Sequence, residues 1–399
     1  MQQQQLLVGV DVGYRKHHVA IGGAKGIVDQ FEIPHNEDGF KYFFSRIANQ
    51  ARQLKVSNVA VGMEGTNGYA RPLDQMIKGK GYKLLNVNNL KLARFKEIFS
   101  APAKTDSIDA KEIVTLMNMV PFMGQAKETL QEVYDVEETQ IKLKRISRRR
   151  RQLVDEKVTL LNRMQADLQS VCPGFIDVFK DVSADYVLRL LSLKSDLRKT
   201  AKVRRTTLQK LPGIGKALSE KIVSWQEIAS FGKEVDWVGP MIYDDAKRIL
   251  ELKKKIELME SQMKILLEQS RLATIIESIP GFGIVTSCEI AGEIGTMQRF
   301  TSEAGLAIYL GMAPVDNSSG DYQGTKTPRQ VNKRAKKAMM AALGIHIRSV
   351  DQSKKYYEKK RAEGKKYNQA LRSLGRHLTR VIWSMVKNDR MYIQKEIEK

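Results

Sequence analysis

A chain of 399 residues, 42% of them hydrophobic, can bury a sizeable core, which argues against a disordered protein and predicts two or three domains. Its 67 lysine and arginine residues against 45 acidic residues leave a formal net charge of +22, so the expected partner is a polyanion such as nucleic acid. No apolar run has the roughly 18 residues needed to span a bilayer, and the first residues lack a signal-peptide pattern, so we expect a cytoplasmic protein without a membrane partner.

The first 120 residues alternate between short runs typical of β-strands and helical stretches. The first three predicted strands follow one another closely and indicate an antiparallel meander, whereas helical segments separate the later two and favour parallel pairing. These strands are predicted at residues 6–12, 18–22, 27–33, 59–63 and 82–87. The order predicts an α/β domain with a ribonuclease-H-like sheet over residues 1–125.

Residues 126–275 are predicted to be a charged, helical middle region. A first long helix carries apolar residues at seven-residue spacing, and a second has a 3-4 alternation typical of a coiled-coil seam. The first series is Ile146, Leu153 and Leu160, and the second is Ile249, Leu252, Ile256, Met259, Met263 and Leu266. The pattern fits either a helical hairpin within one chain or an oligomerisation arm, and both remain open.

Two similar turns, Leu211-Pro-Gly-Ile-Gly and Ile279-Pro-Gly-Phe-Gly, each lead into a helix rich in small residues. This form is typical of a helix-hairpin-helix, in which backbone amides can hold a phosphate, but it also fits an ordinary helix-helix turn. We expect residues 276–399 to form a mainly α domain with such elements.

Two acidic residues occupy the ends of predicted buried strands. Asp11 lies in the apolar run Leu6-Leu-Val-Gly-Val-Asp-Val, where a carboxylate needs a salt bridge or a cation to offset the cost of burial. Glu64 directly follows the strand 59–63, which neighbours the first strand in a ribonuclease-H-like sheet. We therefore expect Glu64 to lie beside Asp11.

A second acidic pair, Asp106 and Asp109, falls in Lys104-Thr-Asp-Ser-Ile-Asp-Ala, where Thr105 can cap a helix. Three residues apart on a helix, both carboxylates face the same way. The simple explanation is an acidic first turn that complements the helix dipole. Together with Asp11 and Glu64, however, the pair provides four hard oxygen ligands suited to Mg²⁺ or Mn²⁺.

Ser319 lies in the polar, glycine-bearing stretch Val315-Asp-Asn-Ser-Ser-Gly, which can expose a hydroxyl group or simply form a turn. Basic clusters stand at 148–151, 333–337 and 354–380, the last with interleaved aromatic residues that are candidate platforms for base stacking. Charge runs are usually solvated faces, yet in this chain they favour binding to a nucleic-acid backbone.

The chain resembles the DEDD transposases of bacterial insertion sequences, a family related to the Piv-type invertases and including RNA-guided bridge recombinases. In the N-terminal part the resemblance rests on Val8-Gly-Val-Asp11-Val, Val61-Gly-Met-Glu64 and Lys104-Thr-Asp106-Ser-Ile-Asp109-Ala. In the C-terminal part it rests on Ile279-Pro-Gly-Phe-Gly, Phe300-Thr-Ser, Tyr309-Leu-Gly-Met-Ala-Pro and Ser319-Gly320. The chain departs from the usual pattern after the serine, where it continues Gln330-Val-Asn-Lys-Arg-Ala-Lys-Lys.

The resemblance implies a RuvC-like N-terminal domain in which Asp11, Glu64, Asp106 and Asp109 bind Mg²⁺, and a C-terminal domain in which Ser319 attacks DNA. It also implies a homo-oligomer, a dimer assembling to a tetramer with a composite site, and in some members a structured guide RNA.

The main hypothesis is thus a metal-dependent, serine-type DNA recombinase. The first alternative is a RuvC-like endonuclease that uses only the carboxylates, with Ser319 as a turn residue. The second is a noncatalytic nucleic-acid-binding assembly protein.

Overall fold

The chain folds as two compact units, Met1–Asp135 and Val136–Lys399. The computed structural model describes residues 5–65, 68–97, 106–123, 129–321, 324–326, 328 and 331–394, without the side chains of residues 90, 106 and 107. The predicted regions 126–275 and 276–399 fall largely within one unit, because α12 (Ile284–Ile294) packs against both long helices of the middle region.

The first unit is built on a six-stranded mixed sheet with the order β3-β2-β1-β4-β5-β6. The strands are β1 (Gln5–Val12), β2 (Lys16–Gly23), β3 (Gly26–Pro34), β4 (Asn58–Glu64), β5 (Lys83–Val87) and β6 (Leu130–Glu132). As predicted, β1, β2 and β3 form an antiparallel meander, and β4 and β5 add in parallel. The short antiparallel strand β6 was not predicted, because three residues carry no alternation.

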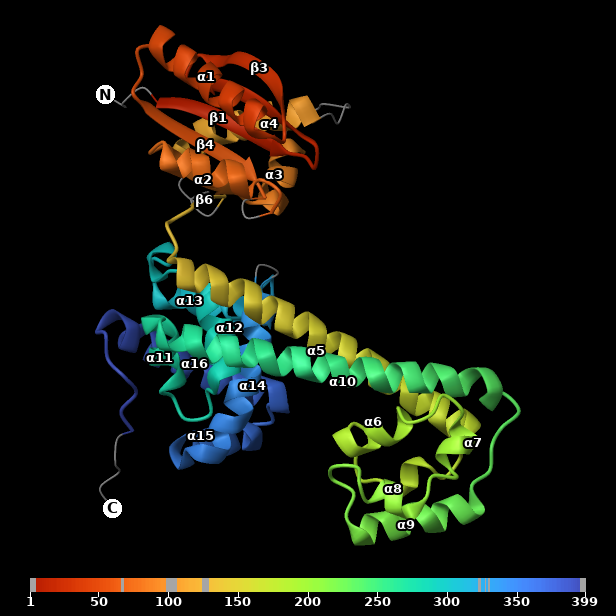
Figure 1. Cartoon of the computed structure of the whole chain (residues 1–399). Helices are drawn as coiled ribbons and strands as arrows, with labels where there is room; N and C mark the ends of the chain where they lie inside the picture. Colours follow the sequence, from red (N-terminus) through yellow and green to blue (C-terminus); the bar gives the residue numbers. More distant parts are fainter. Residues whose placement is uncertain are drawn as a thin grey trace. The chain divides into compact units, whose positions relative to one another are not determined.

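Helices cover both faces of this sheet (Figure 1). They are α1 (Glu37–Gln53), α2 (Arg71–Gly79), α3 (Asn89–Lys96), α4 (Asp106–Met119) and the 3₁₀ turn η1 (Val120–Phe122). Apolar residues of α1 and α2 pack on one face with Val8, Val10 and Met63. Residues of α3 and α4 pack on the other face with Leu7 and Ala60. The strict alternation along β1 and β4 thus divides the core into two layers.

The second unit is almost entirely helical. Its elements are α5 (Glu138–Val171), η2 (Ile176–Val178), α6 (Asp185–Leu191), α7 (Leu197–Thr200), α8 (Arg205–Leu208), α9 (Lys216–Ile228), α10 (Val235–Glu268), α11 (Arg271–Glu277), α12, η3 (Met297–Arg299), α13 (Glu303–Tyr309), β7 (Val315–Asp316), β8 (Thr325–Lys326), α14 (Lys333–Ser349), α15 (Asp351–Ala362) and α16 (Tyr367–Lys387). Figure 1 shows α5 and α10 running side by side.

The predicted seam of α10 faces α5 of the same chain. Leu252 and Ile256 pack against Leu153, and at the end of the series Leu267 is buried more deeply than Leu266. This corresponds to the helical hairpin, one of the two arrangements that the pattern allowed. A coiled-coil contact between two copies stays a prediction.

Both Pro-Gly turns lead into helices, α9 and α12, with Gly213 and Gly281 at φ +91° and +88°. The helix-hairpin-helix itself stays a prediction. A Cβ atom on Gly281 would lie 2.5 Å from the backbone nitrogen of His346, so this turn is pressed against α14. Phosphate binding by these turns stays a prediction.

The basic C-terminal segment contributes to the core. Tyr356, Tyr357 and Trp383, predicted as stacking platforms, are partly buried against the C-terminal core, and Tyr356 bonds to His377 at 2.9 Å. Tyr367 keeps 50% exposure. Trp383 lies on α16, whose amphipathic pattern accounts for its burial, whereas Tyr356 and Tyr357 lie on α15. Within the described residues, none of the helices is both long and apolar enough to cross a bilayer.

Candidate active site

Two carboxylates lie side by side at the ends of adjacent strands. The parallel register of β1 and β4 pairs Gly9 with Gly62, so Asp11 and Glu64, two residues further along each strand, are neighbours. Because side chains alternate between the faces of a sheet, Asp11 and Glu64 share the face of the two glycines. Both carboxylate residues are partly buried. The predicted proximity of Asp11 and Glu64 follows from this register.

Helix α4 lies on that same face and approaches the sheet closely. A Cβ atom on Gly9 would lie 2.3 Å from the carbonyl oxygen of Ala110, and one on Gly62 would lie 2.5 Å from Sδ of Met117. Only glycine permits so close a contact between helix and strand. Asp109 directly precedes Ala110, so this contact brings Asp109 to the face that carries the two strand carboxylates.

A lysine neutralises part of this acidic face. Lys96, the last residue of α3, lies 2.6 Å from Asp109 and 3.5 Å from Glu112. Burial acts to lower the pKa of Lys96, but its bond to Asp109 and the charges of Asp109, Glu112 and Glu64 outweigh burial and raise it. The ammonium group is therefore held in its charged form among the carboxylates.

Glu112 belongs to this cluster although the sequence reasoning did not select it. Burial raises the pKa of its carboxyl group, while Lys96 acts in the opposite direction. Its buried Oε2 is the oxygen that lies 3.5 Å from Lys96 Nζ, and no closer donor contacts it among the described residues. The available signal was spacing, since Glu112 follows Asp109 by three residues just as Asp109 follows Asp106.

Asp106 begins α4, but its side chain lies outside the described part of the structure, as does the predicted cap Thr105. In the described residues no group of three His, Cys, Asp or Glu side chains could hold a metal ion. The chemistry nevertheless fits a divalent cation, because hard carboxylate oxygens gather on one face of the sheet. The lysine ammonium already supplies a positive charge there.

Ser319 lies in the second unit on the connection between β7 and β8. It is exposed, and the next residue, Gly320, has φ +56°, a left-handed conformation that favours glycine. None of the histidines lies near Ser319 in the sequence, and the two that follow it have hydrogen-bond partners of their own: His346 contacts the Pro280 carbonyl at 2.6 Å, and His377 contacts Tyr356 at 2.9 Å.

Comparison with known proteins gave matches along most of the chain. Residues 8–173 match a family model described as a transposase, of the DEDD and IS110 type, and residues 273–358 match the transposase family of IS116, IS110 and IS902.

Curated relatives cover nearly the whole length. The chain is 25% identical to the 43.6 kDa protein of insertion element IS110 from Streptomyces coelicolor, over 97% of this chain and 95% of the relative. It is also 25% identical to the 44.8 kDa protein of insertion element IS116 from Streptomyces clavuligerus, over 98% and 97%.

Among solved structures, the chain has a partial similarity to Thermus thermophilus RuvC in complex with a Holliday junction substrate. The match has 10% identity and a TM-score of 0.25, and it covers 32% of this chain and 99% of RuvC. The fold assignment rests on the strand order of the first unit.

Proposed function

Since this chain belongs to the IS110 and IS116 family of transposases, we propose that it cuts DNA in the cytoplasm with a divalent-metal site formed by Asp11, Glu64, Asp106 and Asp109. The observation that supports this most is the gathering of acidic side chains on one face of the sheet, with Asp11 and Glu64 adjacent and Asp109 carried there by α4. Mg²⁺, or Mn²⁺ in its place, is the proposed cofactor.

In this proposal the strand ends fix Asp11 and Glu64, because β1 and β4 are held on both sides by hydrogen-bonded neighbours. Lys96 is a positioning residue, which holds Asp109 by an ion pair and limits the repulsion among the acids. A pair of bound divalent ions supplies stabilisation of the charge on the attacking and leaving oxygens of a phosphodiester. The carboxylates provide the oxygen ligands for that pair.

The test is cleavage of a plasmid that carries the ends of the element, with Mg²⁺, by the wild type and by Asp11→Asn and Asp109→Asn. We expect both variants to lose cleavage, because the amide removes the ligand charge while keeping the shape of the side chain. Asp38→Asn, an exposed change in the same unit, is the matched control and should cleave normally. Normal cleavage by Asp109→Asn would refute the proposal.

A second candidate function adds strand joining through Ser319. Ser319 is exposed and precedes a glycine in a left-handed conformation, so its hydroxyl group is accessible to DNA. In such a step a bond forms between Oγ of Ser319 and phosphorus, and a phosphorus bond to a deoxyribose oxygen breaks. The hydroxyl proton passes to solvent and the leaving oxygen takes up a proton. The phosphoserine ester keeps the bond energy needed to reseal a strand.

Ser318 and Ser319 are both exposed neighbours, so they form a matched pair for this test. A denaturation-resistant adduct between protein and DNA should persist in Ser318→Ala and disappear in Ser319→Ala. If Ser319→Ala cuts DNA at the wild-type rate and the wild type forms no adduct, cleavage is hydrolytic and Ser319 is a turn residue. If the protein binds DNA but shows no metal-dependent cleavage or joining, the remaining hypothesis is the noncatalytic assembly protein.

The partners implied by the resemblance are part of the same proposal: double-stranded DNA, a homo-oligomer that grows from dimer to tetramer, and a guide RNA. Sedimentation of the purified protein with and without DNA tests the oligomer. Ribonuclease treatment before the cleavage assay tests the RNA, since an RNA-guided enzyme should lose target choice and a protein-guided one should not.

A further inference from the structure

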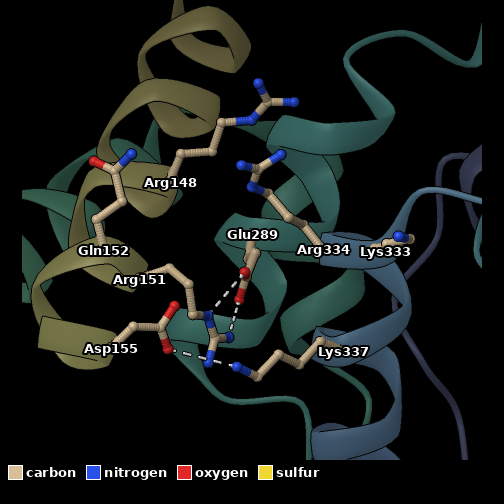
Figure 2. Close-up of a pocket in the computed structure, with 8 residues that line it drawn as sticks. All are labelled: Arg148, Arg151, Gln152, Asp155, Glu289, Lys333, Arg334 and Lys337. Carbon is tan, nitrogen blue, oxygen red and sulfur yellow. Dashed lines mark hydrogen bonds and ion pairs between the residues drawn. The ribbon is translucent and has the colours of Figure 1, made fainter. Parts of the chain in front are cut away.

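A basic pocket opens on the second unit where α5, α12 and α14 meet, and it encloses about 330 Å³ (Figure 2). Five positive side chains and two carboxylates line it, so its net charge attracts an anion. The lining residues are Arg148, Arg151, Gln152, Asp155, Glu289, Lys333, Arg334 and Lys337.

The α5 side of the pocket is rigid. Arg151 donates two hydrogen bonds to Glu289, at 3.3 and 2.6 Å, and Arg148 donates two to Glu293, at 2.6 and 2.8 Å. Glu289 and Glu293 are almost wholly buried, with 2% and 0% exposure. A guanidinium group has five N–H donors, so each arginine keeps donors beyond the two that hold it in place. These arginines are therefore preorganised for a further acceptor.

The α14 side of the pocket carries excess positive charge. Lys333 and Arg334 are exposed, and neither forms an ion pair with any residue of the described ranges. Lys337 lies 3.6 Å from Asp155, but both side chains are about 60% exposed, so this pair contributes little. Figure 2 shows the guanidinium ends of Arg148 and Arg334 converging from α5 and α14. Like charges that converge in this way repel one another unless an anion lies between them.

We propose that this pocket binds a phosphodiester group of the DNA backbone. A phosphate presents several acceptor oxygens, which match the planar donor sets of fixed arginines and the point charges of lysines. The net charge of +22 favours binding of the chain to a polyanion, and the identity of that polyanion as DNA rests on the proposed function. The pocket thus anchors the DNA strand through the second unit and reads no base.

The experiment compares two double variants that remove the same charge. Lys333→Ala with Arg334→Ala alters the pocket, whereas Lys254→Ala with Lys255→Ala alters exposed lysines of α10 outside it. All four positions are exposed on helices and alanine is a strong helix former, so we expect both variants to fold. Circular dichroism and thermal melting verify this.

Binding is measured by fluorescence anisotropy with a labelled DNA duplex, in Ca²⁺ in place of Mg²⁺, over a series of salt concentrations. We expect the pocket variant to lose about tenfold in affinity at 0.1 M salt for each phosphate contact removed, and its salt slope to fall by about 1 per contact. The α10 variant should stay within about twofold of the wild type.

Equal losses in the two variants would overturn the proposal, because a general loss of charge would then explain them. A duplex RNA of the same sequence is tested in parallel, and a loss confined to RNA would overturn the assignment to DNA. The proposed function fails independently of this proposal if the wild-type protein binds DNA through the pocket but does not cleave the plasmid in the presence of Mg²⁺.

Discussion

Replacing Gly9 by alanine tests whether the close contact between β1 and α4 builds the acidic face. The new Cβ atom would lie 2.3 Å from the Ala110 carbonyl oxygen, 3.0 Å from Val114 and 3.1 Å from Ile113. Carbon and oxygen atoms in weak contact are separated by about 3.3 Å, so α4 must withdraw by about 1 Å. Overpacking of this kind costs about 1 to 3 kcal/mol of unfolding free energy.

The same displacement moves Asp109, because it directly precedes Ala110 on α4. A misplacement of about 1 Å costs on the order of 100-fold in rate, so metal-dependent DNA cleavage should fall by about that factor. Urea unfolding and plasmid cleavage are the two assays. Gly23→Ala in β2 is the matched control, since its Cβ meets only the Gln5 carbonyl at an ordinary 3.4 Å. Wild-type stability and cleavage in Gly9→Ala would refute this account of how the face is assembled.

Three further predictions concern buried charges. Lys96→Met removes the partner of the buried Asp109, so the melting temperature should fall without metal and should rise more on adding Mg²⁺ than in the wild type; equal responses to Mg²⁺ would argue against a cation site. Glu293→Ala leaves Arg148 without its buried acceptor and should lower the unfolding free energy of the second unit by about 1.5 to 3 kcal/mol, because Arg148 itself is partly exposed to solvent; a change below about 0.5 kcal/mol by chemical denaturation would contradict this. Burial, aided by two neighbouring histidines, lowers the pKa of His17 from 6.5 to about 4. Its neutral form is therefore favoured by folding, and stability that is complete above pH 6.5 should decline by about 3 kcal/mol as the pH falls to about 4. In a His17→Gln variant the unfolding free energy should depend less on pH in the same assay. A pH dependence equal to that of the wild type would count against the lowered pKa of His17.

Local patterns in the sequence were sufficient to predict the sheet. The alternating apolar residues of β1 and β4 identify two buried strands, and the spacing of the strands fixes which pairs are antiparallel. Because the strand that ends at Glu64 neighbours the first strand in a ribonuclease-H-like sheet, Asp11 and Glu64 could be predicted as neighbours. The α10 seam was predicted in the same way, since a 3-4 alternation is a local property of one helix.

The aromatic residues of the C-terminal segment show where local patterns mislead. Their lysine and arginine neighbours suggested an open binding face, yet Tyr356 and Trp383 pack against the core. A charged residue can extend its polar end to solvent beside a buried aromatic ring, so net charge does not reveal which face of a helix is covered.

The sequence by itself determined the first five strands and their pairing directions, the position of Asp11 and Glu64 at the strand ends and the basic character of the chain, because each depends on residues close together or on composition. Only the tertiary structure decided that Lys96 pairs with Asp109 and that Arg148 pairs with the distant Glu293. Such pairs join separate elements, and the packing that brings them together is set by the shape of the whole core rather than by any local pattern.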